Sequence, residues 1–413
     1  MSTTSPDLAP GPVAPWDRLG PPPRSPLRAR AAERVFRHAV RGLPVRIALA
    51  GGERLGAGGP DAPLMRILDP EAFFHRLGAD SKIGFGESYM AGEWDSPHPA
   101  DLLTPFAERL PSLVPRSLQG LRRWVDAPRP GAERNTTSGS RRNIARHYDL
   151  SNDVFAAFLD ETMTYSSALF PRTDAELAEG QRHKLDRILD QVGATEGTRL
   201  LEVGTGWGSL AIRAAERGAQ VTTLTLSAEQ KELAEKRICE AGLGDRVDVQ
   251  LRDYRHAEGS YDAVVSVEMI EAVGSEYWPG YFAALDRLLA PGGRLGLQVI
   301  TMPHDRMLAS RRSHTWIHKY VFPGGEIPSL RAVEDTAREH TGLLGTGRCS
   351  FGPDYARTLR IWRETFLLRW NDIAAHGFSE RFRRMWEFYL AYSEAGFRAG
   401  YLDVWQLGFR KPS

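Results

Sequence analysis

The sequence predicts an α/β fold in which a smaller N-terminal domain precedes a larger domain built on a doubly wound, mostly parallel sheet. Two patterns lead to this prediction. Between Leu185 and Val267, short apolar strands alternate with segments of helical spacing, which is typical of parallel sheets covered by helices on both faces. Before them, residues 127–142 are rich in Pro, Gly, Ser and Thr, a composition typical of a linker between domains.

The expected elements follow in order along the chain. A length of 413 residues is large for one compact domain, so we expect two. The predicted division is a disordered tail at residues 1–23, a small domain at 24–126, the linker at 127–142 and the larger domain at 143–413. Short runs rich in Val, Leu and Thr predict strands at 199–203, 220–226, 247–251 and 261–267, with a helix before the first and another from Ser227.

Composition and charge exclude several classes of function. The 53 Lys and Arg residues balance 52 Asp and Glu residues, so net charge predicts no nucleic-acid partner. Cys239 and Cys349 lie far apart and in no metal-ligand spacing, so we expect no metal centre and a reducing, cytoplasmic location. No run of about 18 apolar residues occurs, so a membrane-spanning helix is not expected.

Two segments interleave cationic and apolar side chains. Residues 24–46 contain seven Arg and a single acid, Glu33, and their spacing predicts a basic amphipathic helix. Residues 307–319 (MLASRRSHTWIHK) have a similar mixture. Either segment is suited to docking on an anionic membrane surface, although an ordinary solvated protein face has the same composition.

The chain turns tightly after the strand at 199–203, in the sequence LLEVGTGWGS. Gly204 and Gly206 allow a ligand to approach the backbone there. Ser209 stands where the dinucleotide fingerprint has its third glycine, and the next strand ends without an acidic ribose ligand, so nicotinamide cofactors are disfavoured. With Glu202 at the strand end, the arrangement is instead typical of methyltransferases that bind S-adenosylmethionine.

Residues after the next two strands are suited to the nucleoside of that cofactor. Ser227 and Gln230 have the spacing of a capping box, and Gln230 is also placed to reach a ribose hydroxyl. Thr225, at the end of the preceding strand, belongs to the same predicted site. Asp253 is placed to accept a hydrogen bond from the adenine amino group and Tyr254 to cover the ring. Exposed loop residues would show the same pattern.

Seven segments of the chain carry a family resemblance. They are RRNIARHYDLSNDVFAAFLDETMTYSSALF (141–170), LEVGTGWGSLA (201–211), LSAEQ (226–230), VSVEMIEAVG (265–274), HKYVFPGGEIPS (318–329), FGPDYARTL (351–359) and FRAGYLDVWQLGF (397–409). Together they resemble the cyclopropane-fatty-acyl-phospholipid synthases and mycolic acid cyclopropane synthases. Within that family, the actinobacterial branch that makes 10-methylene or methyl-branched fatty acids is the favoured match.

The resemblance implies a catalytic domain with the Rossmann-like methyltransferase fold, which binds S-adenosylmethionine beside an apolar tunnel for an acyl chain. The implied reaction is methyl transfer to the cis double bond of an unsaturated chain in a membrane phospholipid, by an enzyme bound peripherally at the inner face of the membrane. The resemblance also implies a bicarbonate ion as the base. The implied residues are Tyr165, Ser166, Glu202, Gly204, Gly206, Thr225, Gln230, Asp253 and Tyr254 for the cofactor, and Glu271, Tyr355, Ser167, Gln298 and Ile300 for catalysis.

The chemistry explains why a base is needed. Attack of the double bond on the sulfonium methyl group creates a carbocation, which must lose a proton before water quenches it. Glu271 would orient the base and Tyr355 would donate a hydrogen bond to it. Tyr320 and Phe322 are candidates for cation-π stabilisation, or for plain packing.

The sequence departs from the family pattern at Ser167, Gln298 and Ala272, where the family has Cys, His and His. Ser and Gln hold an anion by hydrogen bonds but do not titrate near neutral pH. The departure therefore affects the product, and we favour a methylene branch, which a separate reductase would convert to a methyl branch, over a cyclopropane ring.

Two other functions stay open from the sequence alone. One is a methyltransferase acting on an O, N or S atom of a small metabolite, which would need neither the tunnel nor the pair of Glu271 and Tyr355. The other is a lipid-binding protein without catalysis, which would account for the replaced Cys and His residues. A homodimer, the double-bond position and the headgroup preference are equally undetermined.

Overall fold

The computed structural model describes residues 14–110, 130–137, 139–140, 151–311 and 313–413. A seven-stranded sheet lies at the centre of its larger part. Five strands run parallel to their neighbours, and the last two in sequence are antiparallel, which confirms the predicted doubly wound, mostly parallel sheet. Its order is β10 (Leu344–Ser350), β11 (Asp403–Arg410), β9 (Leu289–Thr301), β8 (Tyr261–Val267), β5 (Arg199–Val203), β6 (Gln220–Thr225) and β7 (Val247–Leu251).

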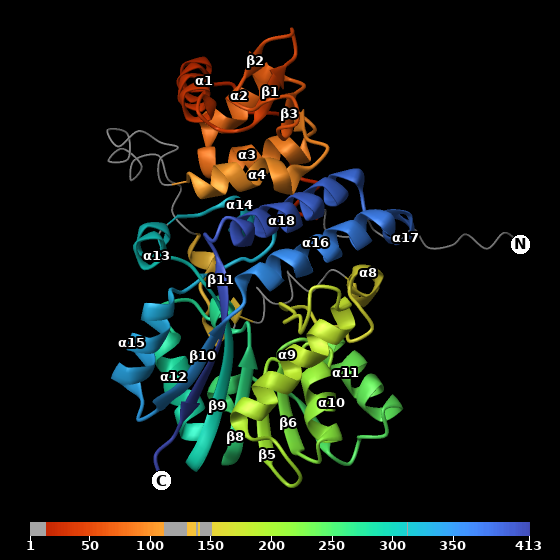
Figure 1. The fold of residues 1–413 in the computed structure, drawn as a ribbon, viewed down its shortest axis with the longest axis vertical. Helices are drawn as coiled ribbons and strands as arrows, with labels where there is room; N and C mark the ends of the chain where they lie inside the picture. Colours follow the sequence, from red (N-terminus) through yellow and green to blue (C-terminus); the bar gives the residue numbers. More distant parts are fainter. Residues whose placement is uncertain (1–13, 111–129, 138, 141–150, 312) are drawn as a thin grey trace, which may run out of the picture.

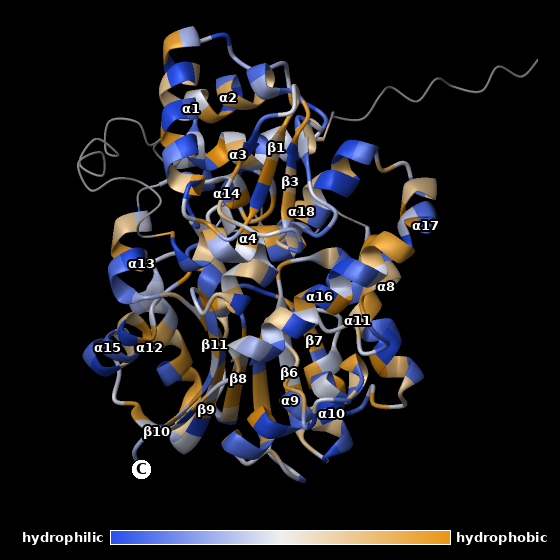
Figure 2. Cartoon of the chain, turned by 45° about the horizontal axis from the view of Figure 1, so that its top comes forward, coloured by the Kyte–Doolittle hydropathy of each residue, from blue (hydrophilic) through white to orange (hydrophobic). Residues whose placement is uncertain are grey.

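Helices cover both faces of this sheet, as Figure 1 shows. One face carries α9 (Leu177–Val192), α10 (Ser209–Glu216) and α11 (Ala228–Glu240), and the other carries α12 (Trp278–Leu288) and α15 (Leu330–His340). Apolar side chains at helical spacing, such as Leu185 and Ile188 in α9, are buried against the strands. Figure 2 shows the apolar strands lying between helices with hydrophilic outer faces.

A second group of helices lies over the carboxyl ends of the parallel strands. In Figure 1, α16 and α18 cross between the large sheet and the N-terminal part of the molecule. The helical elements in this region are η1 (Gly131–Glu133), α8 (Asn152–Phe158), η2 (Tyr254–His256), η3 (Ile270–Ala272), α13 (His304–Ser310), α14 (Trp316–Tyr320), α16 (Gly352–Leu368), α17 (Trp370–Ala375) and α18 (Glu380–Arg398).

The N-terminal part has a four-stranded sheet of its own, and its apolar core is continuous with that of α16 and α18. Trp94, for example, packs against Phe388 of α18 with ring centroids 6.2 Å apart. Residues 111–129 lie outside the described part, so the domain boundary stays a prediction. The elements are α1 (Pro26–Val40), β1 (Arg46–Leu49), β2 (Arg54–Leu55), β3 (Leu64–Ile67), α2 (Pro70–Ala79), α3 (Ser81–Met90), β4 (Trp94–Asp95) and α4 (Pro99–Glu108), with the sheet order β2-β1-β3-β4.

Two predictions for the N-terminus need correction. The expected tail at residues 1–23 is ordered from residue 14, because Trp16 packs on Phe382 with ring centroids 5.2 Å apart and the Gly20 carbonyl accepts a hydrogen bond from Arg76; residues 1–13 lie outside the described part. The basic helix ends at Val40 and not at residue 46. Pro44 cannot continue a helix, and the residues on either side of it, Leu43 and Val45, are buried.

The predicted linker is anchored where it is described. The Asn135 side chain donates a hydrogen bond to the Gly324 carbonyl at 2.9 Å, and Arg255 donates to the Asn135 carbonyl at 3.1 Å. Asn135 therefore ties the described part of this segment to the larger part of the molecule near the carboxyl ends of its strands. No helix among the described residues combines the length and hydropathy needed to cross a bilayer.

Candidate active site

One cavity of about 1130 Å³ begins at the carboxyl ends of β5, β6 and β8 and continues to the helices of the N-terminal part. At one end lies the loop of Gly204 and Gly206, and at the other lie apolar side chains of α1, α3, α4 and α18. Glu268 and Glu271 line it between these ends. Large concave pockets of this kind are the usual place for small-molecule sites in α/β proteins.

The glycine loop has the conformation that only glycine adopts easily. Gly204 has φ of +103°, and a Cβ there would lie 2.7 Å from Met269 Sδ. Gly206 has φ of +52°, and a Cβ there would have no atom within 4 Å. The loop therefore presents bare backbone to open space, which fits the approach of a nucleoside cofactor.

Two buried ionisable side chains, Glu202 and Lys184, line the cavity together with this loop. Glu202 accepts a hydrogen bond from Thr223 at 2.6 Å, and burial raises the pKa of Glu202 to about 8 despite the nearby charge of Lys184. Lys184, on α9, is fully buried and donates to Ser166 Oγ at 2.6 Å. Burial lowers the pKa of Lys184 to about 8, although Glu268, Asp160 and Glu202 oppose that shift.

Sequence reasoning missed Lys184, and a signal for it existed. It lies three residues after the buried Gln181 and four before the buried Ile188, so it falls on the apolar stripe of its helix. A lysine at such a position is rarely buried unless it has a partner or a function.

The residues predicted for the ribose contact one another. Thr225 Oγ1 donates to Gln230 Oε1 at 2.8 Å, so Thr225 holds the Gln230 side chain at the cavity wall. The capping box is only half formed: Ser227 Oγ accepts from the Gln230 backbone at 3.2 Å, whereas the Ser227 backbone donates to Thr225 Oγ1 at 3.1 Å. Gln230 therefore does not reach back to cap the helix, and it lines the cavity beside Thr225.

The residues predicted for adenine also line the cavity. Tyr254 packs edge to face against Tyr281, with ring centroids 5.3 Å apart. Asp253 accepts from Arg255 Nε at 2.9 Å and Nη2 at 2.6 Å, so both carboxylate oxygens already have a donor. Burial raises the pKa of Asp253, but these bonds and the Arg255 charge outweigh it and lower that pKa overall.

Glu268 is the centre of a hydrogen-bond cluster that the sequence did not predict. Its Oε1 accepts from the Ser167 backbone at 3.0 Å and from Gln298 Nε2 at 2.8 Å, and its Oε2 accepts from the Tyr355 hydroxyl at 2.7 Å. Three of the predicted catalytic residues are thus brought together, but on this carboxylate. Its position directly after β8, at the ligand edge of the sheet, was the signal available.

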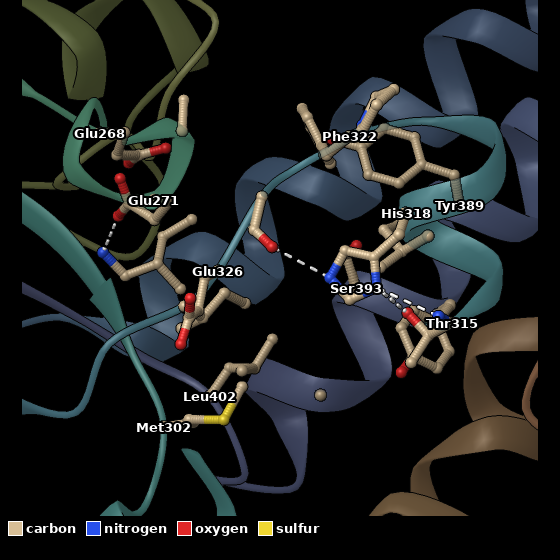
Figure 3. Close-up of a pocket in the computed structure, with 18 of the residues that line it drawn as sticks. Glu268, Glu271, Met302, Thr315, His318, Phe322, Glu326, Tyr389, Ser393 and Leu402 are labelled. Carbon is tan, nitrogen blue, oxygen red and sulfur yellow. Dashed lines mark hydrogen bonds between the residues drawn. The ribbon is translucent and has the colours of Figure 1, made fainter. Parts of the chain in front are cut away.

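Glu271 lies beside it and is less well partnered. Figure 3 shows Glu271 bonded at one oxygen to a backbone nitrogen, which is that of Ile300. Its Oε2 is buried and has no hydrogen-bond partner among the described residues. Burial and the neighbouring charge of Glu268 raise the pKa of Glu271 to about 8. The site therefore holds two carboxylates in unequal surroundings, an arrangement typical of acid and base chemistry.

The comparisons with known proteins agree with this geometry. The family model described as mycolic acid cyclopropane synthetase matches residues 135–407. The chain belongs to this family. It shares 52% identity over 401 residues with the tuberculostearic acid methyltransferase UfaA1 of Mycobacterium tuberculosis, covering 95% of this chain and 94% of that protein. It shares 35% identity over 355 residues with the cyclopropane-fatty-acyl-phospholipid synthase of Escherichia coli, covering 84% and 87%.

Solved structures of the family extend the match to three dimensions. The cyclopropane synthase MmaA2 from Mycobacterium tuberculosis matches with a TM-score of 0.61 and 33% identity, over 66% of this chain and 98% of that one. The mycolic acid cyclopropane synthase CmaA1, in a complex with SAH and CTAB, matches with the same values. This member of the family is therefore an S-adenosylmethionine-dependent methyltransferase with the Rossmann-like fold, of the branch that the sequence indicated.

The two aromatic residues predicted near the reacting centre of this methyltransferase lie apart. Phe322 lines the cavity and packs against Tyr389, with ring centroids 5.6 Å apart, as Figure 3 shows. Tyr389 in turn hydrogen-bonds to Tyr165, whose hydroxyl is 2.8 Å away. Tyr320 instead donates to Glu87 of α3 at 2.7 Å and does not line this cavity. Of the two roles considered for Tyr320, the structure favours packing, because its ring lies in the apolar core and its hydroxyl bonds to the N-terminal part.

Proposed function

We propose that this methyltransferase transfers the methyl group of S-adenosylmethionine to the cis double bond of an unsaturated acyl chain in a membrane phospholipid, and that the product is a 10-methylene branched chain. The observation that carries the proposal is the single cavity, which joins the glycine loop to an apolar section with two carboxylates between them. Similarity to a tuberculostearic acid methyltransferase over nearly the whole chain supports the branched product over a ring.

Each part of the cavity has a role in this reaction. When bound, the cofactor supplies an electrophilic methyl group, and its transfer leaves a carbocation on the acyl chain. Gly204 and Gly206 leave room for the cofactor, and Glu202 and Ser166 face its amino acid end. The aromatic wall that includes Phe322 and Tyr389 excludes water, so that the cation survives until it loses a proton.

The methylene product follows from a short series of steps on the acyl chain. A hydride moves from the carbon that received the methyl group to the adjacent cationic carbon, so the positive charge moves to the substituted carbon. Loss of a proton from the new methyl group then leaves its C–H electron pair in a C=CH₂ double bond. This sequence supplies no further hydride, so a methyl branch requires a separate reductase.

The bicarbonate ion implied by the family resemblance does not fit the donors of this site. The Ser167 backbone, Gln298 and Tyr355 all donate to Glu268. A second anion would therefore find these donors occupied and would lie against two carboxylates.

We further propose that the enzyme meets its phospholipid at an anionic surface, on the cytoplasmic face of the membrane. Arg28 of α1 is exposed and also lines the cavity, and the adjacent Leu27 is 80% exposed. A cation at the cavity wall beside an exposed apolar side chain suits a lipid headgroup and its chain. The second predicted segment is less suited, because Arg311 pairs with Glu326 at 3.3 Å and lies over Trp278; Arg312 lies outside the described residues.

Mass spectrometry of lipids tests the reaction. Cells that express the chain would be supplied with oleate and with methionine whose methyl group carries deuterium, and cells without the gene are the control. We expect phospholipid acyl chains that retain two of the three deuterium atoms and that give a ketone on ozonolysis, because a terminal methylene is cleaved there. A labelled chain that resists ozonolysis and whose fragmentation shows a cyclopropane, not a saturated methyl branch, would establish a ring instead. No labelled chain, from folded protein that binds the cofactor, would reject the proposal.

A further inference from the structure

We propose that the carboxylate of Glu268 is the base in this reaction and takes the place of a bound bicarbonate ion. This inference rests on the proposed function and names the group that removes the proton. The family resemblance implies that an external bicarbonate ion binds the donors of this site. In this structure, those donors already bind Glu268.

The hydrogen bonds show that the site is built around Glu268. Its two oxygens accept from three donors, which come from the loop between α8 and α9, from β9 and from α16. The donor on β9 is itself oriented, because Gln298 Oε1 accepts from Gln406 Nε2 at 3.1 Å and Gln406 Oε1 accepts from Arg187 at 2.7 Å. Because donors on several elements bind the carboxylate, it has a fixed position at the cavity wall. A base in catalysis needs such a fixed position.

The backbone of Glu268 supports a functional reading. Its φ is +52°, and among the described residues Met163 is the only other non-glycine residue with a positive φ. Both residues line the cavity. A side chain disfavours this backbone region, and such residues persist mainly at functional sites where the surrounding structure holds them. Glycine would adopt the same conformation without strain, so the glutamate side chain is present here for what its carboxylate does.

The surroundings also decide which of the two acids carries the charge. Glu268 has three hydrogen-bond donors and the nearby cation of Lys184. Glu271 has only backbone donors, from Ile300 and from its own residue, and a buried oxygen without a partner among the described residues. Donors and a cation favour the charged form of a carboxyl group, and isolation favours the neutral form. Burial raises the pKa of both carboxyl groups. Because Glu268 has more donors and the Lys184 cation, we assign the charge to Glu268 and the proton to Glu271.

The proton balance is complete with the residues present. A Glu268 oxygen forms a bond to a proton of the transferred methyl group, and the electron pair of that C–H bond becomes the second bond of C=CH₂. Glu268 ends the step neutral and returns its proton to solvent as the product leaves. No oxidant, reductant or additional anion is needed.

Two variants of Glu268, with an exposed acid as the control, test the proposal. Glu268→Gln keeps the shape and removes the base, and Glu268→Gly removes the side chain at a φ that glycine accepts. Glu334→Gln changes an exposed acid on α15 that does not line the cavity. Labelled product formation would be measured in CO₂-free buffer with and without added bicarbonate. Binding of S-adenosylmethionine by calorimetry, binding of ¹³C-bicarbonate by NMR and thermal unfolding would be measured beside it.

If Glu268 is the base, wild-type turnover is the same with and without bicarbonate, and Glu268→Gln loses on the order of 100-fold or more while cofactor affinity and folding are retained. Glu268→Gly binds bicarbonate, wild type does not, and added bicarbonate restores part of the activity of Glu268→Gly. The proposal is overturned if wild type loses activity without bicarbonate and regains it on addition, if both proteins bind the ion equally, or if Glu268→Gln keeps nearly full turnover. Absence of any labelled product from wild type would reject the proposed function instead, and the NMR comparison would still test which group fills the site.

Discussion

The two ends of the cavity are built in different ways. The cofactor end consists of residues at or directly after the carboxyl ends of strands of one sheet, such as Thr225 and Gly204. The opposite end is assembled from α1, α3, α4 and α18, which lie far apart in the sequence, and includes Phe36, Phe85 and Phe388. In the proposed reaction, the first end would bind the cofactor through backbone and polar groups and the second would accept the apolar chain through shape. The chemistry would occur at the junction, where Glu268 and Glu271 lie.

The largest expected effect concerns the junction itself and depends on pH. The pKa of Glu271 is raised from its usual 4.5 to about 8, so the folded protein binds a proton there that the unfolded chain releases. Its stabilising contribution is complete below pH 4.5 and is lost as pH rises through about 8. Between pH 5 and pH 8.5, wild type should therefore lose on the order of 3 kcal/mol relative to Glu271→Gln.

Thermal or denaturant unfolding of the two proteins across this pH range measures the difference. Lys184 and Glu202 titrate in both proteins, so the comparison reports Glu271 together with its interaction with Glu268, whose charge raises the Glu271 pKa. Stability profiles that run parallel would mean that Glu271 is ionised throughout, and the division of charge between the two carboxylates would then be wrong.

We expect Gly204→Ala to disrupt the cofactor end of the cavity. The new Cβ would lie 2.7 Å from Met269 at a φ of +103°, so the loop must shift away from the position that admits the cofactor. We expect the affinity for S-adenosylmethionine, measured by calorimetry, to fall by about 100-fold. Gly242→Ala is the matched control, since Gly242 has φ of +71° but no atom near its Cβ and does not line the cavity. Equal losses of cofactor affinity in both variants would mean that general backbone strain, and not the contact with Met269, causes the effect.

The sequence allowed the cofactor end to be predicted because its information is local. A strand, a glycine turn and the residues after each following strand are contiguous motifs, and the parallel topology brings their ends to one edge. Tyr165, Gly204, Gln230 and Tyr254 were therefore placed at the cavity by reasoning from spacing and resemblance. The contacts of these residues were not predicted. The Gln230 side chain, for example, bonds to Thr225 and not, as the expected capping box required, to the helix start.

The junction was predicted only in part, because its arrangement depends on contacts across the fold. The motif around Glu271 drew attention to that acid, whereas the donors converge on Glu268, three residues earlier. The choice between them is made by the backbone conformation of Glu268 and by the position of α16, and neither can be read from spacing. Lys184 was missed for the same reason, since its partners come from other strands and loops.

The apolar end should respond to a bulky residue on α1 without any change at the cofactor end. Ala32 lines the cavity, and Ala32→Trp would fill space there. We expect turnover on an oleoyl phospholipid to fall about tenfold, because overfilling a packed wall displaces a chain that must pass it, while the affinity for S-adenosylmethionine stays unchanged. Arg30→Trp adds the same side chain to an exposed position of the same helix and should leave both quantities unchanged. A loss of cofactor affinity in Ala32→Trp would mean that the two ends are not independent.

The smallest effect tests whether the α1 end of the cavity faces the membrane. Arg34 is exposed on α1, and Arg34→Glu should weaken binding to vesicles of phosphatidylglycerol and phosphatidylcholine by about fivefold at low salt. Arg246→Glu makes the same change of charge before β7, at the amino ends of the strands, and should have little effect. Both variants alter the net charge equally, so a difference between them reflects position. If the two lose binding to the same extent, or if high salt leaves the difference intact, then α1 is not the membrane-facing surface and the lipid enters the cavity from another side.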